Sequence, residues 1–236
     1  MFHVKICGVT SAADARMVVE SGADCIGLNF VAGSPRRLDV EEAVAVAAAV
    51  PPGTLRVGVF AGMPAREILE IARAVRLDAV QLHGHLDGTD GPVDPPETAG
   101  RLAGLRIIRA VRLDACRPPA ERLAGARRWL EEAAAAGNPP AMVIVDAAVV
   151  PHAGPGGLGG TGALVDWAAL TQAGSLPVPM ALAGGLTPGN VAEAIRVTGL
   201  KAVDTASGVE HGPGRKDPAK VKAFVAAAKA AWARLP

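Results

Sequence analysis

Short runs of apolar, often β-branched residues alternate with longer segments rich in Ala, Leu, Arg and Glu, and this order recurs along the whole chain. The apolar runs predict strands, and the amphipathic segments between them predict helices. The predicted strands are His3–Cys7, Cys25–Phe30, Leu55–Phe60, Ala79–Leu82, Arg106–Val111, Ala141–Asp146, Val178–Leu182 and Ala202–Thr205. The predicted helices are Ser11–Ser21, Val40–Val50, Pro64–Val75, Pro96–Ala103, Pro118–Ala136, Val165–Ala173, Asn190–Val197 and Pro218–Arg234.

Eight strand-then-helix units with short connections predict parallel strands that are joined by right-handed crossovers. Continuous apolar strands such as MVIV and VGVF suit a sheet that is covered on both faces. A doubly wound open sheet has the same element order. Eight units in 236 residues, without a second domain, favour closure into a TIM (β/α)8 barrel, an α/β fold, with a single domain over residues 1–236.

The composition limits the possible partners. A formal net charge of +1 provides no field that would attract nucleic acid or an anionic membrane. We see no signal peptide and no run of about 18 apolar residues. The three cysteines show neither a disulfide framework nor CxxC spacing, which favours reduced thiols and a cytoplasmic location. The sequence does not distinguish a monomer from a homodimer.

The ends of the predicted strands carry the candidate chemistry, since a barrel places its active site there. Lys5 and Cys7 lie two residues apart in the first strand, so they point to the same side, with α-carbons roughly 6.6 Å apart. An ammonium group near a thiol stabilises the thiolate, which would make Cys7 a competent base. The alternative is a buried, inert cysteine. Cys25 and Cys116 are expected to be structural.

Asp146 ends the sixth strand after four apolar residues. Partial desolvation there would favour a protonated carboxyl group that can donate a proton, although the residue could equally cap the following turn. A thiolate and a carboxylic acid on different strands could act on opposite sides of a sugar, one removing a proton and one supplying one. His83 and His85 follow the fourth strand without the carboxylate spacing of a metal site, so no metal is predicted.

Glycine-rich segments follow the last two strands at Gly184-Gly185 and Ser207-Gly208. Glycine lets backbone N–H groups approach an anion, and many barrels hold phosphate at these two loops. Arg36 follows the second strand and could hold a substrate carboxylate through a two-pronged contact, or could be an ordinary surface arginine. The glycine-rich segment 147–162 is a candidate lid.

Seven motifs occur in an order that resembles phosphoribosylanthranilate isomerase of tryptophan biosynthesis. They are KICGVT (5–10), SPR (34–36), VGVF (57–60), QLHG (81–84), GGTG (159–162), LAGGLTPGNV (182–191) and DTASGVE (204–210), the last followed by Lys216-Asp217-Pro218. The resemblance implies a TIM barrel that acts on a small molecule, phosphoribosylanthranilate. It also implies an Amadori-type rearrangement without a metal or organic cofactor.

By the same resemblance, Asp146 would be the general acid that protonates the ribose ring oxygen, and Cys7 the general base that removes the C2′ proton. Arg36 matches the family's arginine that contacts the anthranilate moiety. The backbone at Gly184, Gly185, Ser207 and Gly208 would hold the phosphate. One departure is Asn29, which stands where relatives usually carry an apolar or aromatic residue.

Two other functions are compatible with a barrel that has phosphate-binding loops. The histidine-pathway isomerase performs the same rearrangement on another aminoribose, but an Asp would be expected where this chain has Cys7. A barrel that keeps the phosphate loops as a binding or regulatory module is a non-enzymatic alternative. The presence of both Cys7 and Asp146 argues against such a module.

Overall fold

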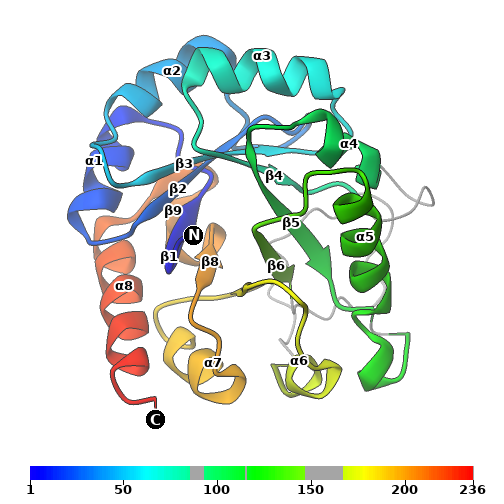
Figure 1. The fold of residues 1–236 in the computed structure, drawn as a ribbon. Helices are drawn as coiled ribbons and strands as arrows, with labels where there is room; N and C mark the ends of the chain where they lie inside the picture. Colours follow the sequence, from blue (N-terminus) through cyan, green and yellow to red (C-terminus); the bar gives the residue numbers. More distant parts are fainter. Residues whose placement is uncertain (86–92, 115, 147–166, 236) are drawn as a thin grey trace.

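Eight parallel strands form a closed barrel in the computed structural model, which describes residues 1–85, 93–114, 116–146 and 167–235. Each strand pairs with the next one in the sequence, and β8 closes the ring on β1 (Figure 1). The strands are β1 (Val4–Cys7), β2 (Cys25–Asn29), β3 (Leu55–Phe60), β4 (Ala79–Leu82), β5 (Arg106–Arg112), β6 (Met142–Asp146), β7 (Met180–Ala183) and β8 (Val203–Thr205). The predicted barrel is confirmed. An open sheet would have two edge strands, whereas here β8 pairs with β1 and closes the ring.

Helices surround the ring of strands on its outside (Figure 1). They are α1 (Ala12–Glu20), α2 (Val40–Ala48), α3 (Ala65–Val75), α4 (Pro96–Arg101), α5 (Ala124–Ala135), α6 (Trp167–Ala173), α7 (Val191–Thr198) and α8 (Pro218–Trp232). Local signals set several of their starts. The Ser11 side chain accepts a hydrogen bond from the Asp14 amide at the start of α1, and Asp39 and Glu42 form a capping box at α2.

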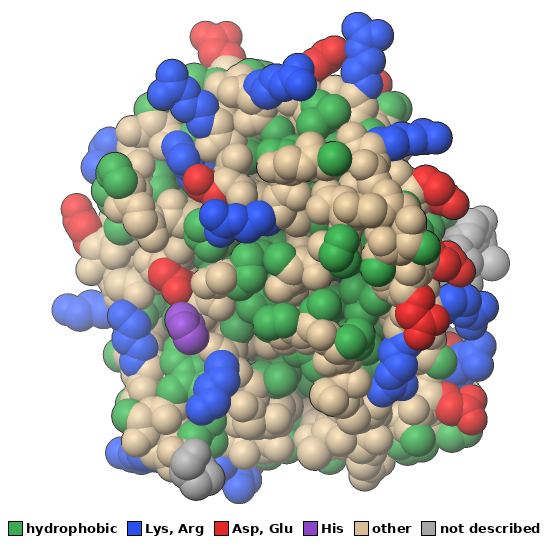
Figure 2. All heavy atoms as spheres, viewed as in Figure 1, with side chains coloured by type: hydrophobic (Ala, Val, Ile, Leu, Met, Phe, Trp, Pro, Cys, Tyr) green, Lys and Arg blue, Asp and Glu red, His purple; other side chains and the backbone are tan. Residues whose placement is uncertain are grey.

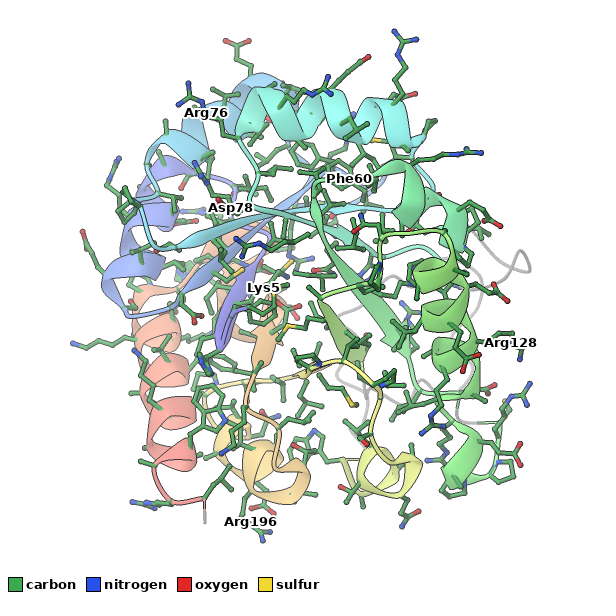
Figure 3. All side chains as sticks on the ribbon, viewed as in Figure 1. Lys5, Phe60, Arg76, Asp78, Arg128 and Arg196 are labelled. Atoms are coloured by element: carbon green, nitrogen blue, oxygen red, sulfur yellow. The ribbon has the colours of Figure 1, made fainter. Side chains whose placement is uncertain are left out.

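The apolar residues form two layers. One cluster lies between the strands and the helices and contains Val4 and Ile6 of β1. The other cluster fills the inside of the barrel and contains Phe2, Cys25 and Ile108. Because side chains alternate along a strand, Lys5 and Cys7 point inward where Val4 and Ile6 point outward. Figure 3 shows Lys5 inside the ring.

Figure 2 shows that hydrophobic side chains gather in the middle of the face seen in Figure 1, and that most charged side chains stand around its edge. Within the described residues, no helix is long and apolar enough to cross a membrane.

Apart from shifts of a few residues at the ends of elements, two features differ from the sequence prediction. The helix predicted over Pro118–Ala136 divides into a 3-10 turn, η1 (Pro119–Glu121), and α5, because Leu123 leaves helical geometry with φ −106° and ψ 9°. A short antiparallel hairpin, β9 (Glu210–Gly212) and β10 (Arg215–Lys216), was not predicted. It follows a 3-10 turn, η2 (Ser207–Val209), after β8. Its strands are too short and too polar to give an alternating pattern.

Candidate active site

Cys7 and Asp146 both lie at the carboxyl ends of their strands, at the same end of the barrel. Both are partly exposed, whereas the residues that precede them in β1 and β6 are buried. Ile144, two residues before Asp146 in β6, belongs to the inner cluster. Side chains two residues apart lie on the same face of a strand, so the Asp146 side chain also lies on the inner face of β6. The thiol and the carboxyl group therefore stand on non-neighbouring strands around one mouth.

Gly27 of β2 makes room for the Cys7 side chain. A Cβ atom added at Gly27 would lie 2.7 Å from the Cys7 Sγ and 3.2 Å from the Lys5 Cε. These contacts show that both side chains pass across the bare backbone of Gly27 inside the barrel. Cys25, one step deeper on the same strand, is fully buried, and burial raises the pKa of its thiol well above the ordinary value.

The Lys5 ammonium group is fully buried and donates a hydrogen bond to the Asp204 Oδ1 at 2.9 Å. Burial opposes the positive charge, but Asp204 and, to a smaller extent, Cys7 outweigh it, so the pKa of Lys5 is raised above its ordinary value. The hydrogen bond of Lys5 therefore goes to β8, and its influence on the thiol acts through charge. Asp204 was not singled out from the sequence, because the pairing spans 199 residues.

A chain of hydrogen bonds orders the loop that carries Arg36. The Asn29 Oδ1 accepts from the Val31 amide at 2.8 Å, and the Asn29 Nδ2 donates to the Ser34 Oγ at 3.2 Å. The Ser34 Oγ in turn accepts from the Arg36 amide at 3.2 Å. Asn29 thus supports the turn that carries Arg36.

The Arg36 guanidinium group is held by Glu210. Its Nε donates to the Glu210 Oε1 at 2.8 Å and its Nη2 to the Glu210 Oε2 at 2.6 Å. These hydrogen bonds raise the pKa of Arg36 above its ordinary value. The Nη1 group and one Nη2 hydrogen are not used in these bonds, so a two-pronged contact with an anion is still available. Sequence reasoning missed Glu210, although it lies within the DTASGVE motif.

The glycine-rich loops after β7 and β8 are in contact at the Leu186 carbonyl oxygen. The Leu186 carbonyl oxygen accepts a hydrogen bond from the Thr205 Oγ1 at 2.7 Å. A Cβ at Gly208 would overlap the same oxygen. Gly184 and Gly185 have φ values of 94° and 60°, which other residues rarely adopt. Gly185 and Ser207 are exposed and Gly184 and Gly208 partly exposed, so an anion can reach this backbone.

A buried cluster anchors the segment after β4 from outside the barrel. The Arg109 Nη1 donates to the Leu82 carbonyl at 3.0 Å, and its Nη2 donates to those of Gly84 and His85 at 2.8 and 3.1 Å. Its guanidinium carbon lies 4.7 Å from the centre of the Trp129 ring. Asp94 lies 3.5 Å from the Nη1. Burial lowers the pKa of Arg109 to about 10 and raises that of Asp94.

His83 lies half-buried just after the end of β4, two residues beyond Gln81. Its Nδ1 is 3.1 Å from the Gln81 Nε2. Burial, aided by Arg112, lowers the pKa of His83 to about 4. The ring is therefore neutral at neutral pH, and the amide of Gln81 can donate to its Nδ1.

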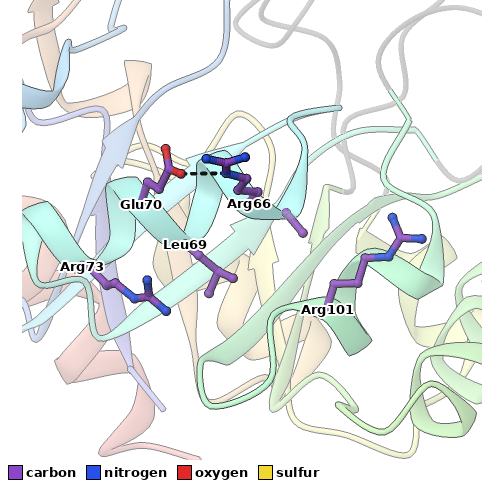
Figure 4. Close-up of a pocket in the computed structure, with 6 residues that line it drawn as sticks. Arg66, Leu69, Glu70, Arg73 and Arg101 are labelled. Carbon is purple, nitrogen blue, oxygen red and sulfur yellow. Dashed lines mark hydrogen bonds and ion pairs between the residues drawn. The ribbon is translucent and has the colours of Figure 1, made fainter.

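A shallow groove of about 400 Å³ lies on the outer surface between α3 and α4 (Figure 4). It is lined by Ala65, Arg66, Leu69, Glu70, Arg73 and Arg101, with Arg66 paired to Glu70 at 3.0 Å. The groove has no strand ends in its lining, so it is separate from the barrel mouth. Among the described residues, no group of three or more His, Cys, Asp or Glu side chains could hold a metal ion.

Two expected features lie outside the described residues. The candidate lid 147–162 is one, and the GGTG motif at 159–162 is the other.

A closed barrel with a thiol, a carboxyl group and an arginine at the strand ends, and glycine-rich loops after the last two strands, defines an enzyme of the phosphosugar-binding TIM-barrel class. Residues 4–227 match the family model described as N-(5'-phosphoribosyl)anthranilate (PRA) isomerase. The N-(5'-phosphoribosyl)anthranilate isomerase of Myxococcus xanthus (strain DK1622) is 40% identical over 227 residues, which is 96% of both chains. This chain belongs to the N-(5'-phosphoribosyl)anthranilate isomerase family.

Solved structures of the family share the fold. The phosphoribosyl anthranilate isomerase from Thermotoga maritima superposes with a TM-score of 0.78 at 33% identity, and the match covers 98% of this chain and all of that one. A family crystal structure in complex with reduced 1-(o-carboxyphenylamino)-1-deoxyribulose 5-phosphate gives a TM-score of 0.75, with the same identity and coverage. The family expected from the motifs is therefore confirmed.

Proposed function

We propose that this chain converts N-(5-phosphoribosyl)anthranilate to 1-(2-carboxyphenylamino)-1-deoxyribulose 5-phosphate, with Asp146 as general acid and Cys7 as general base. The family membership supports the reaction. The observation that supports the two roles is the placement of both groups, partly exposed, at one end of the barrel on non-neighbouring strands. A flat aminoribose between them would present one face to each group.

The reaction then proceeds in two proton transfers. The Asp146 carboxyl group protonates the furanose ring oxygen, and the C1′–O bond breaks as the anilino nitrogen lone pair forms an iminium ion. The Cys7 thiolate removes the C2′ proton, and the electron pair of that C–H bond forms the enolamine. Tautomerisation of the enolamine gives the ketose, so no oxidant or reductant is consumed.

The two anionic groups of the substrate would bind at separate places. We assign the phosphate to the backbone amides at Gly184, Gly185, Ser207 and Gly208, because positive φ values and joined loops keep this backbone open and fixed. We assign the anthranilate carboxylate to Arg36, whose Nη1 edge, which takes no part in the pair with Glu210, can make a charge-assisted pair. The chain as a single domain over residues 1–236 is part of this proposal.

The decisive experiment is steady-state turnover of freshly made substrate, followed by the loss of its fluorescence. Cys7→Ala and Asp146→Ala should each lower kcat by at least about a hundredfold while the protein stays folded. Cys116→Ala and Asp114→Ala, which change exposed residues of the same types, are matched controls and should retain full turnover. Near-normal kcat in either active-site variant would refute the role of that residue.

A parallel assay with the histidine-pathway aminoribose tests the first alternative. Turnover of that substrate alone would replace the proposed reaction with the other rearrangement. Binding of phosphoribosylanthranilate without loss of fluorescence would instead favour a non-catalytic module.

A further inference from the structure

The hairpin β9–β10 brings two charged side chains into the interior beside the proposed active site. The Glu210 side chain is 4% exposed and the Lys216 side chain is not exposed at all. Neither residue has a part in the proton transfers described above. Buried charges are retained only where partners satisfy them, so the contacts of these two groups indicate what they do.

Glu210 holds the Arg36 guanidinium group along one edge, through Nε and Nη2. A side-on pair of this kind fixes the plane of the guanidinium group as well as its position. The pair with Glu210 therefore fixes the direction in which the Arg36 Nη1 group points. The Glu210 Oε1 also accepts a hydrogen bond from the Lys216 Nζ at 2.7 Å, so the carboxylate is itself fixed from the other side.

Lys216 connects the end of β1, which carries Cys7, to the loop after β8. Its Nζ donates to the Cys7 carbonyl oxygen at 2.6 Å and to the Ala206 carbonyl oxygen at 3.2 Å. Ala206 directly precedes Ser207 and Gly208, the proposed phosphate backbone. With Glu210 included, the three hydrogen bonds account for all three ammonium hydrogens.

The charges within this cluster favour an anionic substrate. Two cations and one carboxylate leave a formal excess of one positive charge beside the mouth. Burial opposes the charge of Glu210, but hydrogen bonds from Arg36 and Lys216 outweigh it and hold the pKa of the carboxyl group below its ordinary value. Burial lowers the pKa of Lys216 in spite of Glu210.

The hairpin is also fixed from outside the cluster. The Thr10 Oγ1 donates to the Gly214 carbonyl at 2.5 Å, and the Lys216 amide donates to the Asp14 Oδ2 at 3.2 Å. Both contacts come from the segment that follows β1. The turn between β9 and β10 therefore rests on the chain that leads away from Cys7.

We infer that Glu210 and Lys216 are positioning residues for the isomerisation: Glu210 sets the direction of the Arg36 guanidinium group, and Lys216 holds the end of β1, with Cys7, in register with the phosphate loop. The inference rests on the proposed function. It assigns each residue a separate effect. Glu210 acts on substrate binding through Arg36, and Lys216 acts on the proton transfer through the backbone of Cys7.

The first test separates KM from kcat in Glu210→Gln, a variant that keeps the side-chain shape and removes its charge. We expect KM for phosphoribosylanthranilate to rise about tenfold and kcat to change less than about threefold. Glu193→Gln is the matched control, because Glu193 makes the same kind of pair with Arg196 on the solvent-exposed face of α7. It should leave both constants unchanged.

A double-mutant cycle tests whether Glu210 acts through Arg36. If it does, Arg36→Ala with Glu210→Gln should have a KM within about twofold of Arg36→Ala alone. A further tenfold rise in the double variant would overturn the inference for Glu210. If Glu210→Gln does not fold, Glu210→Asp replaces it, since the shorter carboxylate keeps the charge and loses the reach.

The second test is Lys216→Met, which keeps the length and apolar stem and removes the three donors. We expect kcat to fall about tenfold or more and KM to change less than about threefold. Lys222→Met, a change at an exposed lysine of α8, is the control. Should Lys216→Met not fold, Lys216→Arg, whose wider head cannot satisfy the same three acceptors, is measured by the same criterion.

The outcomes distinguish the inference from the proposed function. A wild-type protein that does not isomerise phosphoribosylanthranilate would refute the proposed function itself. Wild-type turnover together with unchanged KM in the Glu210 variant and unchanged kcat in the Lys216 variant would overturn only the positioning roles. Equal losses in both constants for both variants would indicate general loosening of the mouth and would also overturn them.

Discussion

Substitution of Arg109 tests how much its hydrogen bonds to the segment after β4 contribute to stability. Replacement by Leu removes a donor from the buried carbonyl oxygens of Leu82 and Gly84. It also removes one from the partly buried oxygen of His85, which still accepts from the Asp94 amide at 3.4 Å. Each buried acceptor left without a donor costs about 1–3 kcal/mol, and the cation–π contact with Trp129 adds about 1 kcal/mol. The Leu side chain offsets part of this loss, because it avoids the burial of a charge.

We therefore expect Arg109→Leu to lower the free energy of unfolding by about 3–5 kcal/mol. Arg109→Lys should lose less, because an ammonium group keeps the charge beside Asp94 but cannot span three carbonyls. Arg128→Leu on the exposed face of α5 (Figure 3) is the control and should change stability by less than about 0.5 kcal/mol.

Urea denaturation at pH 7, followed by circular dichroism, measures these differences. The midpoint of unfolding should fall while the slope with urea stays the same. A loss below about 1 kcal/mol in Arg109→Leu would show that the three carbonyl contacts contribute little net stability. The carbonyl oxygens would then not be the source of the stability that Arg109 provides.

Three further predictions concern the barrel interior and the mouth. Lys5→Met should lower the free energy of unfolding by about 3–5 kcal/mol in urea melts, because Asp204 would stay buried without its cation; a loss below about 1 kcal/mol would contradict this. Gly27→Ala should lower kcat more than it raises KM, since the new methyl group would press on the Cys7 Sγ, and an unchanged kcat would argue against the tight packing. Burial lowers the pKa of His83 from 6.5 to about 4. Between these two pH values the unfolded chain binds more protons than the folded chain. The free energy of unfolding should therefore fall as the pH drops from 6.5 to about 4. The His83→Gln variant should show a flatter dependence in urea melts at several pH values, and an identical slope would contradict the assignment.

The strands could be predicted from the sequence because buried parallel strands read as continuous apolar runs. The prediction for Leu55–Phe60 matches β3, and that for Val178–Leu182 differs from β7 (Met180–Ala183) by two residues at its start. The break at Leu123 escaped detection because Pro118 and Pro119 suit a first helical turn and gave no sign of a separate 3-10 turn.

Residues at strand ends could be singled out because the barrel topology itself places them at one mouth. Lys5 was recognised only through its spacing to Cys7. Its partner Asp204 could not be recognised from the sequence, because the two residues become neighbours only when β8 pairs with β1. Glu210 and Lys216 could not be assigned from the sequence, since their contacts depend on the fold of a hairpin with no strand pattern. Long-range charge pairs follow from tertiary closure and leave no local signal.

The shared Leu186 oxygen has a consequence for protein engineering. Since Thr205 and Gly208 both rest on this atom, neither glycine-rich loop has a shape of its own that would survive transfer into another scaffold. Anyone who grafts the anion site onto a different barrel would have to transplant both segments together with their adjoining strands. Because the acceptor is a main-chain oxygen, it constrains the residues at 205 and 208 and leaves the side chain at 186 free to vary on this account.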